Sequence, residues 1–281
     1  MLNSKFLFKI YYIGTNEYFG SQRQPRLMTI EESILNALIS KGYIQDIEKS
    51  KFEFASRTDR YVSARGACFT CIAKKDPVLM EINSALPKRI GIWAYSEVPM
   101  EFISRFGAIL RHYVYIVPFP ISYFEKTSGI DIDLMKKACK DLEGYHDFAN
   151  FSKKEDIKIV TIRDMDSVNL SIYDDYIVFQ FKSRAFLRQQ VRRMVKKVLE
   201  LGINEISYKE FLNLFDVSKN VSYQPADPQG LILWDIKFNE NIDFIVDNKS
   251  KERMDSYFIK KKLDYNLKYQ LFRALQQNDF S

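Results

Sequence analysis

The hydrophobic positions in the first part of the chain alternate between the spacing of strands and the spacing of helices. Continuous apolar runs predict strands at residues 6–13, 52–55, 66–73, 90–98 and 112–117. Thr29 begins a helical pattern in the capping-box arrangement with Glu32, and its apolar face contains Ile30, Ile34, Leu35, Leu38 and Ile39. A second helix is predicted to begin at Asp76-Pro77, because an N-cap aspartate followed by proline is typical of a helix start.

The second half of the chain repeats this alternation. Helices are predicted at residues 131–142 and 186–201 and from Ser207 onward, and strands at 159–172, 176–182 and 231–238, with a turn at Asp174-Asp175. Each half therefore mixes antiparallel-looking strands with two helices. This pattern predicts an α+β fold of two similar mixed lobes, residues 1–104 and 105–240, that share an antiparallel sheet.

The pattern changes beyond residue 240. Residues 249–278 are highly charged and helix-prone, so residues 241–281 are expected to form a charged helical C-terminal appendage. A solvated or packed helix is the favoured interpretation of this segment, and a dimer contact and an RNA contact are the alternatives.

Composition narrows the class of protein. The chain has 281 residues, of which 46% are hydrophobic, so it can bury a sizeable core and is not a disordered protein. Its formal net charge of +6 is a mild basic excess that is compatible with a polyanionic partner. No segment resembles a secretory signal and no apolar run is long enough to span a bilayer, so a soluble, cytoplasmic protein is expected.

Cys68 and Cys71 form a C-x-x-C pair, a spacing that in other contexts binds zinc or performs redox chemistry. Here the pair lies within the predicted strand 66–73, where residues three apart point to opposite faces. The other soft ligands, Cys139, His112 and His146, are scattered along the chain. We therefore expect buried structural cysteines and no metal site.

The predicted helix 186–201 carries a concentration of positive charge. Arginines at 184, 188 and 192 recur every four residues beside an apolar stripe, and they are joined by Arg193, Lys196 and Lys197. Side chains four apart lie on one helix face, so these residues would form a basic ridge. A phosphate-binding ridge is favoured over a solvated helix, because solvated helices usually interleave acidic residues and the first one here is Glu200.

Asp59 lies in a loop between the predicted strands 52–55 and 66–73. An aspartate in a loop is most often a turn or cap residue, so its spacing alone favours a structural role. Arg57, Arg60 and Arg65 surround it, and their charges would keep a carboxylate ionised and attract RNA.

Several ordered segments of the chain resemble one family, the TruA tRNA pseudouridine synthases. One short block, S-R-T-D at residues 56–59, matches the family's catalytic R-T-D loop. A single tripeptide would carry no weight, but seven blocks follow the family's order within residues 5–240. The blocks are 12–24 (YIGTNEYFGSQRQ), 56–59, 83–87 (NSALP), 105–115 (RFGAILRHYVY), 143–151 (EGYHDFANF), 186–202 and 225–231 (PADPQGL).

The chain departs from the family pattern at two points. The family usually follows its aspartate with Ala-Gly-Val-His, whereas this chain has Arg60, Tyr61, Val62 and Ser63. Ser21 stands where the family has an aromatic residue before Gln-Arg-Gln. Both changes bear on how the loop contacts RNA and on which uridines are chosen.

The resemblance implies the pseudouridine synthase fold, with an RNA-binding cleft between the two lobes. The implied activity is isomerisation of uridine to pseudouridine in the anticodon stem-loop of tRNA, at tRNA positions 38, 39 and 40, without a cofactor or a metal. The implied partners are tRNA and a second copy of the chain in a homodimer, with no membrane association.

The resemblance also implies roles for single residues. Asp59 aligns with the catalytic carboxylate of the family, and Arg192 with the arginine that pairs with it. Tyr113 aligns with the tyrosine that stacks on the target base, and Arg57 with the arginine implicated in extruding that base. Contacts to the RNA backbone are expected from Arg23, Gln24, Arg184, Arg188 and Arg193.

The chemistry of Asp59 stays open at this point, since a carboxylate beside C1′ or C6 could attack the sugar, attack the base or remove a 2′ proton. Two other functions also stay open. One is a non-catalytic RNA-binding or RNA-folding protein on the same scaffold, and the other is the same chemistry on another RNA or another tRNA position. A metal-dependent nuclease is the weakest alternative, because the sequence has no carboxylate cluster with metal-ligand spacing.

Overall fold

The computed structural model describes residues 3–154, 159–239 and 242–277. Its strands are β1 (Ser4–Tyr12), β2 (Glu53–Phe54), β3 (Ser63–Ala73), β4 (Ile90–Val98), β5 (Ala108–Pro120), β6 (Gly144–Asp147), β7 (Ile162–Tyr173), β8 (Tyr176–Ser183), β9 (Leu231–Phe238) and β10 (Ile245–Val246). Its helices are α1 (Ile30–Ser40), α2 (Leu79–Ser84), α3 (Ser104–Gly107), α4 (Ile121–Thr127), α5 (Ile132–Asp141), α6 (Gln190–Gly202), α7 (Tyr208–Leu212) and α8 (Asn248–Leu275), with 3-10 turns η1 (Ala149–Phe151), η2 (Asn213–Phe215) and η3 (Pro228–Gly230).

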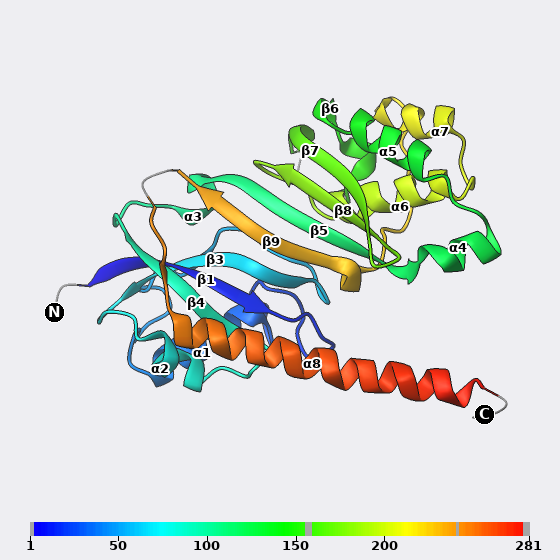
Figure 1. Ribbon diagram of the computed structural model, residues 1–281. Helices are drawn as coiled ribbons and strands as arrows, with labels where there is room; N and C mark the ends of the chain where they lie inside the picture. Colours follow the sequence, from blue (N-terminus) through cyan, green and yellow to red (C-terminus); the bar gives the residue numbers. More distant parts are fainter. Residues whose placement is uncertain (1–2, 155–158, 240–241, 278–281) are drawn as a thin grey trace.

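The strands form one sheet in the order β10-β4-β1-β3-β9-β5-β8-β7-β6, with β2 also paired to β3 (Figure 1). Most neighbouring strands run antiparallel, but β3 and β9 are parallel, with Ser63 opposite Ile232 and Ala64 opposite Leu233. The predicted α+β class is therefore confirmed, whereas the prediction of an antiparallel sheet is wrong at this pair. The strand β9 pairs antiparallel with β5 on its other side, and in this direction it runs parallel to β3.

The parallel pairing of β3 with β9 is called the seam below. Gly66 is required beside it, because a Cβ atom at this residue would lie 2.8 Å from the carbonyl oxygen of Trp234. The guanidinium carbon of Arg65 lies 5.0 Å from the centroid of the Trp234 ring, within the range of a cation–π contact. Lys9 of β1 reaches across β3 to place its Nζ 2.7 Å from a carboxylate oxygen of Asp235. Side chains thus reinforce a short backbone pairing.

The helices gather at both ends of the sheet. In Figure 1, α5, α6 and α7 lie at the end that carries β6, β7 and β8, whereas α1 and α2 lie near β4. Buried apolar side chains from the sheet and these helices form the core. Aromatic rings contribute strongly to it, and the rings of Phe8 and Phe69, for example, stack at a centroid distance of 4.9 Å.

The start of α1 follows the sequence prediction. Thr29 accepts a hydrogen bond at Oγ1 from the backbone N–H of Glu32, at 3.2 Å. The buried face of the helix contains Ile30, Ile34, Leu35, Ala37 and Leu38. Ile39, which was expected on this face, is 40% exposed in the last turn.

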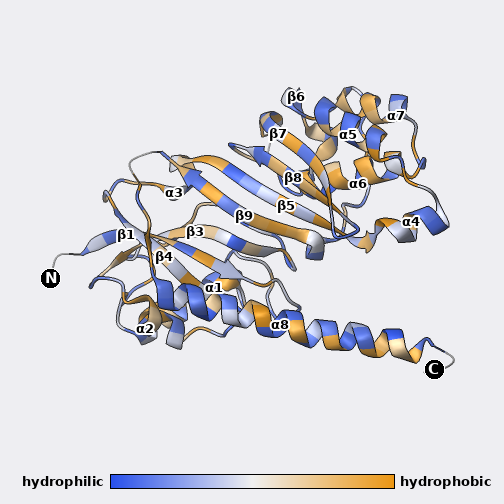
Figure 2. Cartoon of the chain, in the orientation of Figure 1, coloured by the Kyte–Doolittle hydropathy of each residue, from blue (hydrophilic) through white to orange (hydrophobic). Residues whose placement is uncertain are grey.

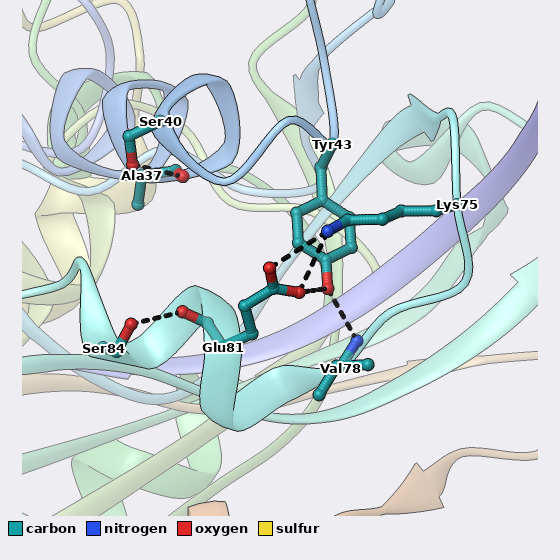
Figure 3. A network of polar contacts seen from close by, with 7 residues as sticks. All are labelled: Ala37, Ser40, Tyr43, Lys75, Val78, Glu81 and Ser84. Carbon is teal, nitrogen blue, oxygen red and sulfur yellow. Dashed lines mark hydrogen bonds and ion pairs between the residues drawn. The ribbon is translucent and has the colours of Figure 1, made fainter.

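The start of α2 differs from the prediction, because a contact from elsewhere in the chain replaces the expected cap. The helix begins at Leu79 and not at Asp76-Pro77. The hydroxyl of Tyr43 accepts a hydrogen bond from the Val78 N–H at 3.0 Å and donates one to Glu81 at 2.7 Å (Figure 3). Lys75 donates to both carboxylate oxygens of Glu81 at 3.0 Å. This network fixes the first turn of α2 without help from Asp76.

As predicted, the C-terminal segment contains a helix, α8. Residue 278 and the predicted boundary at 240–241 lie outside the residues that the structure describes. Asp247 caps α8 by accepting a hydrogen bond from the Ser250 N–H at 2.7 Å. Arg253 ties the first turns to β4 and α2, because it donates to the carbonyl oxygens of Ile90 in β4 and of Asn83 in α2. The rest of α8 extends away from the sheet (Figure 1), and Figure 2 shows hydrophobic and hydrophilic residues mixed along it.

Large apolar side chains are exposed on this outer part of α8. Their exposed fractions lie between 54% and 72%, and the residues are Ile259, Leu263, Tyr265, Leu267, Tyr269, Leu271, Phe272 and Leu275. We call them the α8 apolar set.

Among the described residues, none of the helices combines the length and the apolar character that crossing a bilayer needs.

Candidate active site

The loop that carries Asp59 is fixed by the segment that follows β1. The backbone N–H of Thr58 donates to Ser21 Oγ at 2.8 Å, and its carbonyl oxygen accepts from the Ser21 N–H at 3.1 Å. The hydroxyls of Thr58 and Tyr12 share a hydrogen bond of 2.8 Å. Gly20 has a φ of +92°, and a Cβ atom there would lie 2.9 Å from the Thr58 carbonyl oxygen. Ser21, one of the two departures from the family pattern, is therefore a fully buried support of this loop.

The structure brings Asp59 and Arg192 together, although they lie far apart in the sequence. Arg192 Nη1 donates to Asp59 Oδ2 at 3.0 Å. The Arg192 side chain is 9% exposed and its Nε donates to the carbonyl oxygen of Ala226 at 2.7 Å, so the guanidinium is held from two sides. The Asp59 side chain is 37% exposed. The result is an open carboxylate oriented by a buried, fixed cation.

Tyr113 lies close to this pair. Its hydroxyl shares a hydrogen bond of 3.1 Å with Ser56 Oγ, and its ring meets the edge of Phe186 at a centroid distance of 5.1 Å. Burial raises the pKa of Tyr113, and the negative charge of Asp59 acts in the same direction. The phenol therefore stays neutral near the carboxylate.

A cleft of about 990 Å³ surrounds these residues. Seven of the nine residues singled out from the sequence line it: Arg23, Gln24, Arg57, Asp59, Tyr113, Arg188 and Arg192. Arginines outnumber carboxylates in the lining by eight to three, so the cleft has a positive potential suited to a polyanion. Arg57 and Arg188 are exposed, which leaves both side chains accessible to a ligand.

The prediction of a basic ridge on one helix face is wrong. The helix α6 begins at Gln190, and Gln189 before it has a φ of +59°, so Arg184 and Arg188 lie in the connection from β8 and not on the helix. Gln190 fixes this start by accepting a hydrogen bond at Oε1 from the Leu187 N–H at 2.7 Å. Helical spacing was therefore assigned to residues that are not helical.

The remaining basic residues of the ridge are also engaged elsewhere. Arg193 is 8% exposed, and its guanidinium carbon lies 5.0 Å from the centroid of the Tyr223 ring. Lys196 and Lys197 both form ion pairs with Glu200, at 3.1 and 2.6 Å. Neither Arg184 nor Arg193 is among the residues that line the cleft, although Arg184 is exposed.

Sequence reasoning missed several residues of the cleft, namely Ser56, Arg105, Arg111, Arg163 and Phe186. Arg111 could have been found, because it lies two residues before Tyr113 on the same face of β5. Its guanidinium donates to the carbonyl oxygens of Ala55 and Arg184, and so links the Asp59 loop to the end of β8. Arg163 has no comparable signal, because its place in the cleft depends on the packing of β7.

The cysteines are structural, as predicted. Cys68 and Cys71 are buried in β3, and burial raises the pKa of both thiols, so they are poorly reactive. Within the described ranges, no group of three His, Cys, Asp or Glu side chains is arranged to hold a metal ion.

Comparisons with known proteins point to one family. A family profile described as tRNA pseudouridine synthase matches residues 138–239. The chain is 34% identical over 257 residues to tRNA pseudouridine synthase A of Methanothermobacter thermautotrophicus, covering 92% of this chain and 86% of that protein. It is 31% identical over 278 residues to the protein of the same name from Archaeoglobus fulgidus, covering 99% of both. The Pyrococcus furiosus protein of this name is 34% identical over 257 residues, covering 90% of both.

The match to the Archaeoglobus fulgidus protein covers 99% of the chain and so spans both the loop of Asp59 and the helix of Arg192. The family profile spans only the second of these. The resemblance first noted in short sequence blocks therefore holds over 90% or more of this chain for all three relatives. The chain belongs to the tRNA pseudouridine synthase family.

Proposed function

We propose that this protein isomerises uridine to pseudouridine in the anticodon stem-loop of tRNA, with Asp59 as its catalytic carboxylate. The observation that carries the proposal is the partly exposed Asp59 carboxylate, held at 3.0 Å by the buried guanidinium of Arg192 inside an arginine-rich cleft. Membership of the tRNA pseudouridine synthase family supports both the reaction and the class of substrate.

The reaction breaks the N-glycosidic bond of uridine, turns the uracil and joins C5 to C1′. An ionised carboxylate beside the nucleotide suits this chemistry, because it can stabilise positive charge on the sugar or form a covalent intermediate. Arg192 would hold the orientation of the Asp59 carboxylate through the reaction. Attack on the sugar, attack on the base and removal of a 2′ proton are all compatible with this role.

A uridine in a stem must leave the base stack to reach Asp59. Tyr113 supports this step, because its ring is placed near the carboxylate and is held by Ser56 and Phe186. We assign it to stacking on the extruded base. Arg57 is exposed in the same cleft lining, two residues from Asp59, and is assigned to extrusion of that base.

The tRNA would enter between two lobes, residues 1–104 and 105–240. Support comes from the cleft lining, since Arg23 and Gln24 belong to the first lobe and Arg188 to the second. These three residues are assigned to the RNA backbone. Arg184 is kept as a further contact, because it is exposed and lies next to Ala185 of the lining. Arg193 is left out, since it packs on Tyr223.

The protein would act as a homodimer in the cytoplasm. Support for a second copy comes from the α8 apolar set, because monomers rarely expose so many large apolar side chains on one element. A helix end that carries leucines and tyrosines is a surface that association can bury. The favoured interpretation of the C-terminal appendage thereby changes from a solvated helix to a dimer contact.

Mapping of pseudouridine in tRNA transcripts tests the function. The wild-type protein should introduce pseudouridine into the anticodon stem-loop, Asp59→Asn should abolish the product, and both should bind tRNA alike. Asp133→Asn is the matched control, because the side chain of Asp133 is 93% exposed and is not among the residues that line the cleft.

The alternatives give different results in the same assay. Binding without product by the wild-type protein would mean an RNA-binding or RNA-folding protein. Product at other positions or in other RNAs would change the assigned substrate and keep the chemistry. Full activity of Asp59→Asn would show that Asp59 is not the catalytic carboxylate. Cleavage of the RNA strand that a chelator stops would indicate a metal-dependent nuclease.

A further inference from the structure

Tyr61, two residues after Asp59, has an unusual backbone conformation. Its φ is +67°, in the left-handed region that large side chains rarely adopt. Such a conformation persists where surrounding contacts over-determine it, and it often occurs beside functional residues. The hydrogen bond from the Val62 N–H to the Asp59 carbonyl oxygen, at 3.3 Å, closes the turn around it. The backbone of Asp59 therefore depends on Tyr61 keeping this conformation.

Arg60 supplies contacts that hold the turn. Its guanidinium carbon lies 4.1 Å from the ring centroid of Phe19 and 4.8 Å from that of Tyr61, so both rings pack on it. Its Nη2 donates to the carbonyl oxygen of Asn16 at 3.0 Å. Phe19 and Asn16 both belong to the segment after β1. The side chain of Arg60 thus clamps the turn of Asp59 onto that segment.

The backbones of the two segments also touch directly. A Cβ atom at Gly14 would lie 2.3 Å from the carbonyl carbon and oxygen of Tyr61, so this position accepts no larger residue without movement. The Gly14 N–H donates to Ser63 Oγ at 3.1 Å. The turn is therefore packed against a second chain segment over its whole length.

We infer that Arg60 is a positioning residue: with Phe19 and Tyr61 it stabilises the left-handed turn that points the Asp59 carboxylate at Arg192. The inference rests on the proposed function of Asp59. It accounts for two residues that depart from the family pattern, since Arg60 provides the contacts that a bulky residue at position 61 needs. The rival is that Arg60, which lines the cleft, binds an RNA phosphate.

The geometry favours positioning over phosphate binding. Two rings pack on the guanidinium, Nη2 is bonded to Asn16, and Nε is buried. Of the three guanidinium nitrogens of Arg60, one is bonded and one is buried, which leaves Nη1 as the main donor for a phosphate. Arg57 and Arg188, in contrast, are exposed in the same cleft lining.

The test compares Arg60→Ala and Arg60→Lys in the wild-type and Tyr61→Gly backgrounds. The readouts are the single-turnover rate of pseudouridine formation at saturating tRNA, the Kd for tRNA, and the salt dependence of Kd. Arg60→Ala should lower the rate roughly tenfold to a hundredfold, because small displacements of a reacting group have effects of this size. Kd and its salt dependence should stay the same.

Arg60→Lys separates the two roles. Lysine keeps the charge but has no planar face for the two rings, so its rate should fall like that of Arg60→Ala. Glycine at position 61 adopts a positive φ without strain, so Arg60→Ala should have a much smaller effect in the Tyr61→Gly background. Amide exchange gives a readout that needs no activity, because Arg60→Ala should speed exchange at Thr58 and Val62.

Several results would overturn the inference. An unchanged rate of pseudouridine formation, with weaker tRNA binding and a salt slope of Kd reduced by about one, would make Arg60 a phosphate contact. Equal effects of Arg60→Ala in the wild-type and Tyr61→Gly backgrounds would also contradict the inference. So would unchanged amide exchange in the loop of Asp59. Failure of the proposed function looks different, because the wild-type protein itself would then form no pseudouridine.

Discussion

Replacing Arg192 tests the link between the two parts of the candidate site. In Arg192→Gln the hydrogen bond to the buried carbonyl oxygen of Ala226 is lost, and such bonds from charged donors contribute about 1.5–3 kcal/mol. The ion pair with Asp59 contributes less, about 0.2–1 kcal/mol, because that carboxylate is 37% exposed and is screened by water. The free energy of unfolding should therefore fall by about 2–4 kcal/mol in total.

The effect on the reaction should exceed the effect on folding. At a temperature where Arg192→Gln is still folded, Asp59 loses the donor that fixes its orientation. The single-turnover rate should fall by about a hundredfold or more, as expected for a reacting group displaced by about 1 Å. Arg192→Lys should keep part of the rate, because an ammonium group can reach one of the two partners but lacks the fork that binds both.

Arg193→Gln is the matched control. Arg193 is the next residue of the same helix and is equally buried, at 8% exposed, but it packs on Tyr223 and not on Asp59. The Arg193→Gln substitution should lower the free energy of unfolding and leave the rate of pseudouridine formation by the folded protein unchanged. Thermal unfolding and pseudouridine formation, measured on the same samples, separate the two effects. A folded Arg192→Gln protein with the wild-type rate would refute the reasoning, and so would equal losses of rate in the two variants.

Three further predictions concern binding, assembly and acid stability. Arg188→Gln should weaken tRNA binding and reduce the salt slope of Kd by about one, whereas an unchanged slope in filter-binding titrations would remove Arg188 from the RNA contacts. Leu263→Gln with Leu267→Gln should convert a dimer into a folded monomer, which sedimentation measures, and a dimer that persists would place the interface elsewhere. The hydrogen bond from Tyr43, followed by that from Lys75, lowers the pKa of Glu81 below its usual value of 4.5. Its contribution to stability is therefore present above that value and is lost as the pH falls through the lowered pKa. Melting curves of wild type and Glu81→Gln should thus converge in acid, and a constant difference between them would contradict this assignment.

Local signals in the sequence predicted the parts of the fold that depend on local contacts. Thr29 and Ser207 cap α1 and α7 as their spacing indicated, and at Ser207 both hydrogen bonds of the capping box are present. Asp174 and Asp175 form the turn between β7 and β8 with positive φ at both residues. Each of these features is decided by residues within a few positions of one another.

Predictions failed where a distant part of the chain decides the local structure. The hydroxyl of Tyr43, for example, takes the place of Asp76 at the start of α2. The late start of α6 is an exception, because the hydrogen bond between Gln190 and Leu187 that fixes it is local. The pairing of Asp59 with Arg192 was expected from the family resemblance and could not be derived from spacing, because 133 positions separate the two residues. The hydrogen bond from Arg192 to the carbonyl oxygen of Ala226 could not be predicted from the sequence pattern either.

The position of β9 at the seam has a consequence for synthesis of the protein. This strand lies at the centre of the sheet but comes from residues 231–238, so the ribosome makes it after β1 to β8. Until then β5 lacks this neighbour along its length and β3 lacks it at Ser63 and Ala64, and unpaired edges are prone to pair with other chains. The centre of the sheet therefore closes only after the strands on both sides of it have been made, and a nascent chain that stalls before residue 231 leaves these edges open.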